Sequence, residues 1–239
     1  VLYPDLSADV WGIGLMALNS VDNFSDYKAT VYSVTFHMEA GYDQPEKEPE
    51  TPVVADGATL LNTYGKVFGN LGTCINLFQL QNASTLKLMK EHYNSVTSEN
   101  EMKPDALLGH SPSLMSVADA KAMGYLLPDN YKDTTVPKIN FTNVDRILDL
   151  CAKNGFRYRA HTLVWHSQTP NWFFREGYSS SGSFVSPEVM DARMEFYIRS
   201  VMKHVYDNEY SSCVYTWDVV NEYWNADDTN WIAVYGAKN

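Results

Sequence analysis

The sequence predicts an α/β fold of parallel strands, a (β/α)8 TIM barrel of which the 239 residues cover about the first four βα units. Two observations support this fold class. From about residue 57 onward, short apolar segments typical of strands alternate with amphipathic segments typical of helices, and this order implies parallel βα units. Successive predicted strands also end in clusters of polar side chains, and the carboxyl ends of barrel strands form the face on which active sites lie.

The amino-terminal part of the chain follows a different pattern. Apolar and polar residues alternate over residues 32–38, which predicts a strand with one buried face, and residues 11–18 predict another strand. Because two strands cannot form a core alone, we expect residues 1–43 to be a β-rich segment that ends a larger β domain. Residues 44–56 are rich in proline and charge and are expected to form an extended linker. The barrel segment is expected to occupy residues 57–239.

The first predicted elements of the barrel segment are a strand, a helix and a strand. Residues 72–77 are short and apolar, and residues 93–98 form a second strand-like stretch. The helix between them covers residues 82–92, and Asn82 or Ser84 is expected to cap its amino terminus.

A long connection punctuated by proline and glycine, residues 106–140, separates these elements from the next helix. Thr142 is predicted to cap that helix, and Gly155 to end it in a left-handed conformation. Between them, apolar residues recur at i, i+3, i+4 and i+7, which defines one buried face. The remaining predicted elements are a strand at residues 156–164, a helix opened by Ser186 and Pro187, and a strand at residues 214–220.

Polar groups gather at the ends of three of these strands. They are Glu99, Asn100 and Lys103 after the second strand, His161, Trp165, His166 and Gln168 around the end of the third, and Asn221 and Glu222 after the fourth. A doubly wound open sheet would also place its site at the carboxyl ends of its strands, so it remains the alternative fold. No GxGxxG motif follows the first strand, which argues against a dinucleotide cofactor.

The composition narrows the range of partners. The formal net charge is −11 and the sequence pI is about 4.9, which argues against nucleic acid and an anionic membrane surface. No apolar run reaches the length of a membrane span, and no signal peptide is expected at the start of the chain. The cysteines Cys74, Cys151 and Cys213 lie far apart in apolar stretches and are expected to be buried thiols, without a metal or redox motif.

Three of the strand-end stretches resemble glycoside hydrolase family 10. They are SENEMK at Ser98–Lys103, RAHTLVWHSQTP at Arg159–Pro170 and WDVVNE at Trp217–Glu222, and they occur in the family's order. The resemblance covers roughly residues 57–239 and implies a (β/α)8 barrel and a retaining endo-β-1,4-xylanase, which hydrolyses internal bonds of xylan. Residues 1–43 would then end a family 22-type carbohydrate-binding module.

The resemblance also implies a role for each polar residue. Glu222 would be the general acid/base, and Asn221 would bond the 2-hydroxyl of the sugar that is cleaved. His161, Trp165 and Gln168 would line the non-reducing side next to the scissile bond, while Glu99, Asn100 and Lys103 would bind one sugar further out. Glu101 is expected to face away from the cleft, and His166 to orient a carboxylate.

The chemistry adds an expectation about Glu222. Retaining glycosidases place two carboxyl groups ~5–5.5 Å apart, and the acid must stay protonated near neutral pH. We therefore expect a raised pKa for Glu222, from partial burial beside Trp217, Tyr223 and Trp224 and from the second carboxylate. The second carboxylate is the nucleophile of the reaction, and in the family it is a glutamate after the seventh strand. That residue is expected to lie outside this chain. The chain alone is therefore expected to be inactive.

No metal and no other cofactor are expected. His161 and His166 could suggest a metal, but their spacing in a strand would point them to opposite faces. The expected partners are xylan and xylo-oligosaccharides, and also a second chain if one carries the rest of the barrel. A secreted or cell-surface location is expected because xylan is an extracellular polymer. The alternatives are an inactive xylan-binding fragment, or a related barrel glycosidase acting on another β-1,4-glycan.

Overall fold

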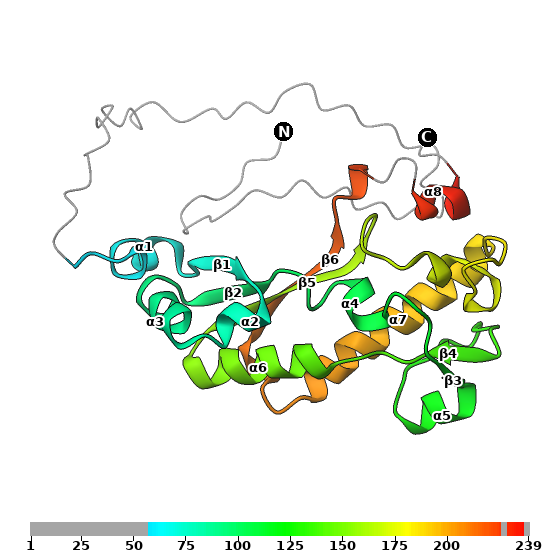
Figure 1. Cartoon of the computed structure of the whole chain (residues 1–239), viewed down its shortest axis with the longest axis horizontal. Coiled ribbons are helices and arrows are strands. Elements are labelled where there is room, and N and C mark those ends of the chain that lie inside the picture. The colour runs from blue at the N-terminus through cyan, green and yellow to red at the C-terminus, as the bar shows by residue number, and fades with distance from the viewer. Residues whose placement is uncertain (1–56, 226–228, 237–239) are drawn as a thin grey trace, which may run out of the picture. The chain divides into compact units, whose positions relative to one another are not determined.

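The computed structural model describes residues 57–225 and 229–236 (Figure 1), which belong to one compact unit, Val54–Asn239. The β-rich segment expected at residues 1–43 and the linker expected at residues 44–56 lie outside the described residues. Within the described part of the chain, no helix is long and apolar enough to cross a membrane.

Four parallel strands form the central sheet. They are β1 (Gly72–Ile75), β2 (Ser95–Ser98), β5 (Arg157–Trp165) and β6 (Val214–Asn221). Their order in the sheet, β1-β2-β5-β6, is their order along the chain. A doubly wound sheet reverses its strand order at a switch point, whereas neighbouring strands of a barrel follow one another. The sheet therefore has the strand order of a barrel segment, and the doubly wound alternative is wrong.

The predicted helices begin and end close to the expected residues. They are α3 (Ala83–His92), α6 (Thr142–Asn154) and α7 (Pro187–Asp207), whereas α1 (Leu60–Phe68), α2 (Leu77–Leu80) and α8 (Asn230–Tyr235) were not predicted. Asn82 caps α3 by accepting bonds from the amides of Ser84 and Thr85, both at 3.1 Å. Ser186 caps α7, and Gly155 ends α6 with φ 74°.

The cap predicted for α6 was wrong. Thr142 is the first residue of α6, and the side-chain oxygen of Asn140 accepts the bond from the Thr142 amide at 3.1 Å. Asn140 lies two residues upstream, so the side chain reaches the first turn from outside the helix. Threonine is a common cap residue, which is why the sequence indicated Thr142, but the cap position itself is Phe141, whose side chain forms no capping bond.

The long connection over residues 106–140 contains regular structure. It holds α4 (Pro104–Leu108), the antiparallel strands β3 (Leu114–Ser116) and β4 (Thr135–Pro137), and α5 (Val117–Ala122). Strands of three residues are too short to show a period. Short 3-10 helices complete the fold: η2 (Asn171–Phe174), η3 (Glu176–Tyr178), η4 (Ser211–Cys213) and η5 (Tyr223–Asn225).

The core lies between one face of the sheet and the helices α6 and α7 (Figure 1). Alternate residues of β5, Tyr158 and Ala160, are fully buried against it. The thiols of Cys151 and Cys213 are buried there as expected. Cys74 is exposed, which contradicts the prediction, because its neighbour Ile75 takes the core side of β1 and Cys74 therefore points to the opposite face.

One buried ion pair joins the α5–β4 loop to α7. Arg193 of α7 has no exposed surface and donates to both carboxylate oxygens of Asp133 at 2.7 and 2.6 Å. Its remaining bonds go to the backbone oxygens of Phe173 and Arg175, at 2.7 and 2.9 Å. The guanidinium also lies over the ring of Tyr178, 3.8 Å from its centroid.

Candidate active site

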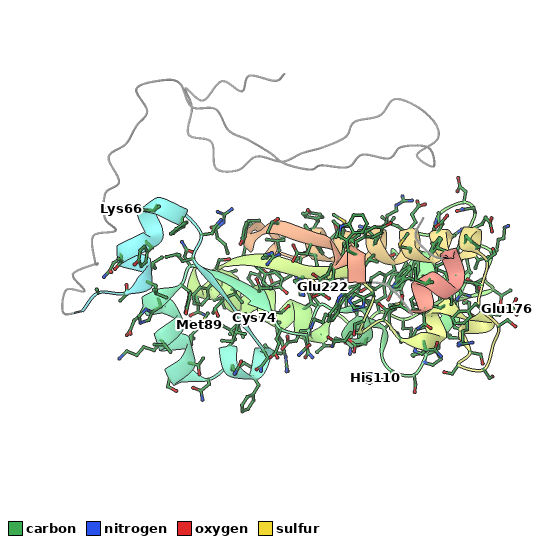
Figure 2. All side chains as sticks on the ribbon, turned by 90° about the horizontal axis from the view of Figure 1, so that it is seen from above. Lys66, Cys74, Met89, His110, Glu176 and Glu222 are labelled. Atoms are coloured by element: carbon green, nitrogen blue, oxygen red, sulfur yellow. The ribbon has the colours of Figure 1, made fainter. Side chains whose placement is uncertain are left out.

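Glu222 stands at the carboxyl end of β6 in a backbone conformation that is rare for a side-chain-bearing residue. Its φ is 48°, in the left-handed region where non-glycine residues cost free energy and are enriched at functional sites. The side chain is 45 % exposed. Figure 2 labels it on the strand-end side of the sheet.

Two donors from the end of β5 bind the same oxygen of Glu222. Trp165 Nε1 donates to Oε2 at 2.9 Å, and His166 Nε2 lies 2.9 Å from the same atom. Trp165 and Asn221 are opposite each other in the β5–β6 register, which explains why these two strand ends meet. The arrangement orients the carboxylate through one of its two oxygens.

These contacts lower the pKa of Glu222, with the hydrogen bond from His166 as the main cause and that from Trp165 next. The expectation that burial beside aromatic residues raises the pKa of Glu222 was therefore wrong. Hydrogen bonds to the charged form outweigh burial here because the side chain is half in solvent. Trp217 does not cover it either: its indole donates to Tyr206 of α7 on the other side of β6.

Three of the residues predicted after β2 and β5, namely Asn100, Trp165 and Gln168, form a cluster around Lys103. Its ammonium donates to Asn100 Oδ1 at 3.0 Å and to Gln168 Oε1 at 2.8 Å, and it lies 4.7 Å from the ring centroid of Trp165. Gln168 also donates to Asn100 at 3.3 Å. Trp165 therefore links the Lys103 cluster to Glu222, through its ring face on one side and its N–H on the other.

The two glutamates that flank Asn100 have different surroundings. Glu99 Oε2 accepts a bond from Asn76 Nδ2 at 3.3 Å, so a residue that directly follows β1 joins the edge of the site. Sequence reasoning missed Asn76 because the first strand was predicted to run to residue 77, whereas β1 ends at Ile75. Glu101 accepts from the backbone amides of Leu77 (2.5 Å) and Asn100 (3.1 Å), which gives it a structural role.

His161 belongs to a second network on the open face of the sheet. Its Nδ1 lies 2.9 Å from Asp218 Oδ2, and Arg159 Nη2 lies 2.5 Å from the same oxygen. The peptide bond between His161 and Thr162 is cis. Sequence reasoning missed both Arg159 and Asp218, although both lie inside the stretches that suggested the family.

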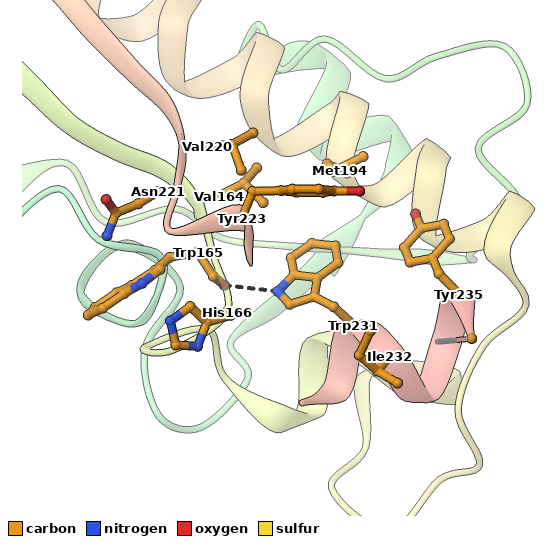
Figure 3. Close-up of a pocket in the computed structure, with 11 residues that line it drawn as sticks. Val164, Trp165, His166, Met194, Val220, Asn221, Tyr223, Trp231, Ile232 and Tyr235 are labelled. Carbon is orange, nitrogen blue, oxygen red and sulfur yellow. Dashed lines mark hydrogen bonds between the residues drawn. The ribbon is translucent and has the colours of Figure 1, made fainter. Parts of the chain in front are cut away.

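Two hollows adjoin these groups. One of about 440 Å³ is mainly apolar, and Trp165, His166 and Asn221 line it together with Tyr223 and Trp231 (Figure 3). Trp231 Nε1 donates to the Trp165 backbone oxygen at 2.8 Å. The other, of about 500 Å³, is the more polar hollow, and its lining includes Glu99, Lys103, Arg159 and His161. All the predicted site residues thus lie in or beside one of these hollows, or contact residues that do.

The described residues hold no group of three or more His, Cys, Asp or Glu side chains that could bind a metal ion. The two histidines are engaged separately. His161 contacts Asp218, and His166 contacts Glu222.

Comparisons with known proteins agree with this geometry. Residues 59–238 match the family model described as Glycosyl hydrolase family 10. Endo-1,4-beta-xylanase A of Butyrivibrio fibrisolvens is 49 % identical over 179 residues, which cover 74 % of this chain and 44 % of that protein. Endo-1,4-beta-xylanase Y of Acetivibrio thermocellus is 36 % identical over 184 residues, 77 % of this chain and 15 % of that protein. The chain therefore spans less than half the length of these relatives.

A solved structure shares the fold. The Clostridium thermocellum N-terminal endo-1,4-beta-D-xylanase 10B, with its CBM22 and GH10 modules in complex with xylohexaose, superposes with a TM-score of 0.60 at 31 % identity. The match covers 80 % of this chain and 36 % of that one. The four sequential parallel strands are thus a part of a (β/α)8 barrel, as predicted. With the family model matching well over half of its residues, the chain belongs to glycosyl hydrolase family 10.

Proposed function

We propose that this chain supplies the general acid/base and the non-reducing-side sugar contacts of a retaining endo-β-1,4-xylanase. The main support is the geometry of Glu222, whose side chain is exposed at the end of β6 and is oriented by two hydrogen-bond donors to one carboxylate oxygen. The names of the relatives, which are xylanases, support xylan as the substrate. The complex of the related barrel with xylohexaose supports a chain of several xylose units as the ligand.

In the first step, protonated Glu222 gives its proton to the glycosidic oxygen while a second carboxylate attacks the anomeric carbon. The bond to the leaving sugar breaks, and a covalent glycosyl-enzyme forms. In the second step, Glu222 as a carboxylate takes a proton from water, whose oxygen attacks the same carbon and releases the nucleophile. Since Oε2 accepts the bonds from Trp165 and His166, Oε1 is the oxygen that faces the reacting atoms.

The lowered pKa of Glu222 suits the second step, in which it acts as a base. The first step needs the opposite shift. A second carboxylate ~5–5.5 Å away, the separation in retaining glycosidases, would raise the pKa of Glu222 by charge repulsion. This effect would end when the second carboxylate becomes covalently bound to the sugar. We propose that the remaining part of a family 10 barrel brings that group, either in the same polypeptide or as a second chain.

The Lys103 cluster is proposed to bind sugar on the non-reducing side. Lys103, Asn100 and Gln168 offer donors and acceptors for hydroxyl groups, with Glu99 beside them, while the Trp165 ring provides an apolar surface of the kind on which sugar faces stack. His161 and Asn221 would take hydroxyls nearer the scissile bond. A secreted or cell-surface location is proposed because xylan is an extracellular polymer. The CBM22 module of the related xylanase supports a carbohydrate-binding origin for residues 1–43.

Reconstitution tests this proposal. The chain is mixed with a polypeptide that carries the last four βα units of the Butyrivibrio fibrisolvens relative, and release of reducing sugar from xylan is measured. We expect no turnover by either part alone, activity for the mixture, and a loss of roughly 10²- to 10⁴-fold for Glu222→Gln, the usual contribution of a general acid/base. Robust turnover by the chain alone, or full activity of the Glu222→Gln mixture, would contradict the proposal.

Binding measurements separate the alternatives. An inactive xylan-binding fragment has no use for the charge of Glu222, so Glu222→Gln would leave its affinity for xylohexaose unchanged, and neither form would turn over xylan in the mixture. A barrel glycosidase for another β-1,4-glycan would bind cellohexaose more tightly than xylohexaose. A preference for xylohexaose together with Glu222-dependent turnover is the result that we expect.

A further inference from the structure

We infer that Asp218 is a positioning residue that fixes the tautomer of His161, so that Nε2 of His161 presents a lone pair to a sugar hydroxyl. The inference rests on the proposed function for its sugar-binding part only. The tautomer itself follows from contacts within the chain.

The backbone places the two residues face to face. His161 on β5 and Asp218 on β6 are direct partners in the parallel register. The Thr162 hydroxyl donates to the Asp218 backbone oxygen at 2.9 Å, and Thr162 is fully buried. Asp218 is therefore anchored through its backbone as well as its side chain, and its carboxylate meets the imidazole at a defined position.

The chemistry of the contact selects one tautomer. An ionised carboxylate has no hydrogen to donate, so the 2.9 Å contact between Asp218 Oδ2 and His161 Nδ1 requires the hydrogen on Nδ1. A neutral imidazole with hydrogen on Nδ1 has a bare Nε2, which accepts hydrogen bonds. His161 is 19 % exposed and lines the polar hollow, so a ligand in that hollow has access to the ring.

Arg159 completes the arrangement. Its guanidinium bonds the same oxygen of Asp218 at 2.5 Å, and it lies two residues before His161 on the same face of β5. A guanidinium can only donate hydrogen bonds, so Oδ2 of Asp218 is the acceptor in this contact as well. Both bonds end on Oδ2, so an asparagine at position 218 could place its amide oxygen there and preserve both contacts without the charge.

A second histidine–aspartate pair in the chain supplies an internal contrast. His204 on α7 contacts Asp145 on α6 through Nε2, at 2.7 Å, and its ring stacks on Phe141 at a centroid distance of 3.6 Å. By the same reasoning His204 carries its hydrogen on Nε2. The two pairs therefore predict opposite tautomers in one molecule, and only the pair at the strand ends adjoins the proposed sugar site.

The test is a long-range ¹H–¹⁵N correlation spectrum of the full chain with ¹⁵N-labelled histidine, above the pH at which the rings titrate. His161→Gln and His204→Gln identify the two rings by loss of their signals. We expect protonated Nδ1 and bare Nε2 for His161, and the reverse for His204. A wild-type spectrum with hydrogen on Nε2 of His161 would overturn the inference.

Variants at position 218 then test the cause. Asp218→Ala should abolish the preference of His161 for Nδ1–H, Asp218→Asn should retain it, and Asp145→Ala should alter His204 alone. An unchanged His161 tautomer in Asp218→Ala would also overturn the inference. Calorimetric titration with xylohexaose completes the test: Asp218→Ala should weaken binding by about 3- to 10-fold, the worth of one hydrogen bond, and Asp218→Asn by much less.

The two measurements fail independently. If the tautomers are as expected but xylohexaose binds no form of the chain, the positioning by Asp218 stands and the proposed sugar site is wrong. If xylohexaose binds wild type and Asp218→Ala equally, the tautomer has no role in sugar binding and that part of the inference is wrong.

Discussion

Two buried cationic side chains have similar surroundings but differ in the groups that accept their hydrogen bonds. Arg193 and Lys103 each lie over an aromatic ring, Tyr178 and Trp165 respectively. Arg193 is fully buried, and its bonds go to a carboxylate and two backbone oxygens. Lys103 is 9 % exposed, and its bonds go to the neutral side chains of Asn100 and Gln168.

The difference indicates separate roles. The charge of Arg193 is matched by Asp133, and the pair connects elements that are far apart in the sequence. Among the described residues, no carboxylate forms an ion pair with Lys103. An ammonium bound only by side-chain amides at the rim of a hollow keeps its attraction for ligand oxygens. The first cation therefore stabilises the fold, and the second is available for binding.

The largest expected effect is on stability. Arg193→Met leaves Asp133 and two backbone oxygens without their donor, so the free energy of unfolding should fall by about 3–5 kcal/mol, as when one partner of a buried ion pair is removed. Urea unfolding followed by circular dichroism measures it. Arg199→Met, which removes an exposed pair with Glu195 on the same helix, is the matched control and should cost less than about 0.5 kcal/mol. Equal losses for the two variants would break the comparison.

The next effect is on binding. Lys103→Met keeps the length and apolar stem of the side chain, so we expect a small change in stability. Affinity for xylohexaose should fall by roughly 10- to 100-fold, the range for hydrogen bonds from a charged group. Calorimetric titration of the chain measures it. Lys153→Met, which removes an exposed lysine that pairs with Asp149 on α6, should leave binding unchanged. A loss of folding without a specific loss of affinity would place Lys103 in the same class as Arg193.

The smallest effect is a shift in one titration. His166→Ala removes the main cause of the lowered pKa of Glu222, so that pKa should rise toward the ordinary glutamate range. Carboxyl ¹³C NMR during a pH titration follows it. Glu188, whose pKa is lowered by the Ser186 hydroxyl, is the control and should not change. A Glu222 pKa that stays low would mean that Trp165 alone is sufficient.

The same shift gives a sign for pH-dependent stability. Because the pKa of Glu222 is lower in the folded chain than in the unfolded one, its ionised form favours folding above the unfolded pKa. That contribution is lost as the pH falls through the folded pKa. In His166→Ala this acid-side dependence should become weaker, which unfolding experiments on either side of the glutamate range would detect.

The local features of the fold were predictable because they depend on neighbours in the sequence. Asn82 and Ser186 cap helices as expected, and Gly155 ends α6, since each acts within one helical turn. The strand ends that carry Glu99, His161 and Asn221 also lie where the apolar segments placed them. The stretches that resemble family 10 added the identity of the site, because they combine residue types that periodicity does not constrain.

What the sequence determined by itself was the order of the parallel strands, the polar residues at their ends and the family. Only the tertiary structure decided which of those residues meet. Trp165 and Glu222 are 57 positions apart, and so are His161 and Asp218, so no local pattern relates them. The direction of the Glu222 pKa was decided in the same way, because it depends on whether hydrogen-bond donors or apolar surfaces surround the carboxylate in space.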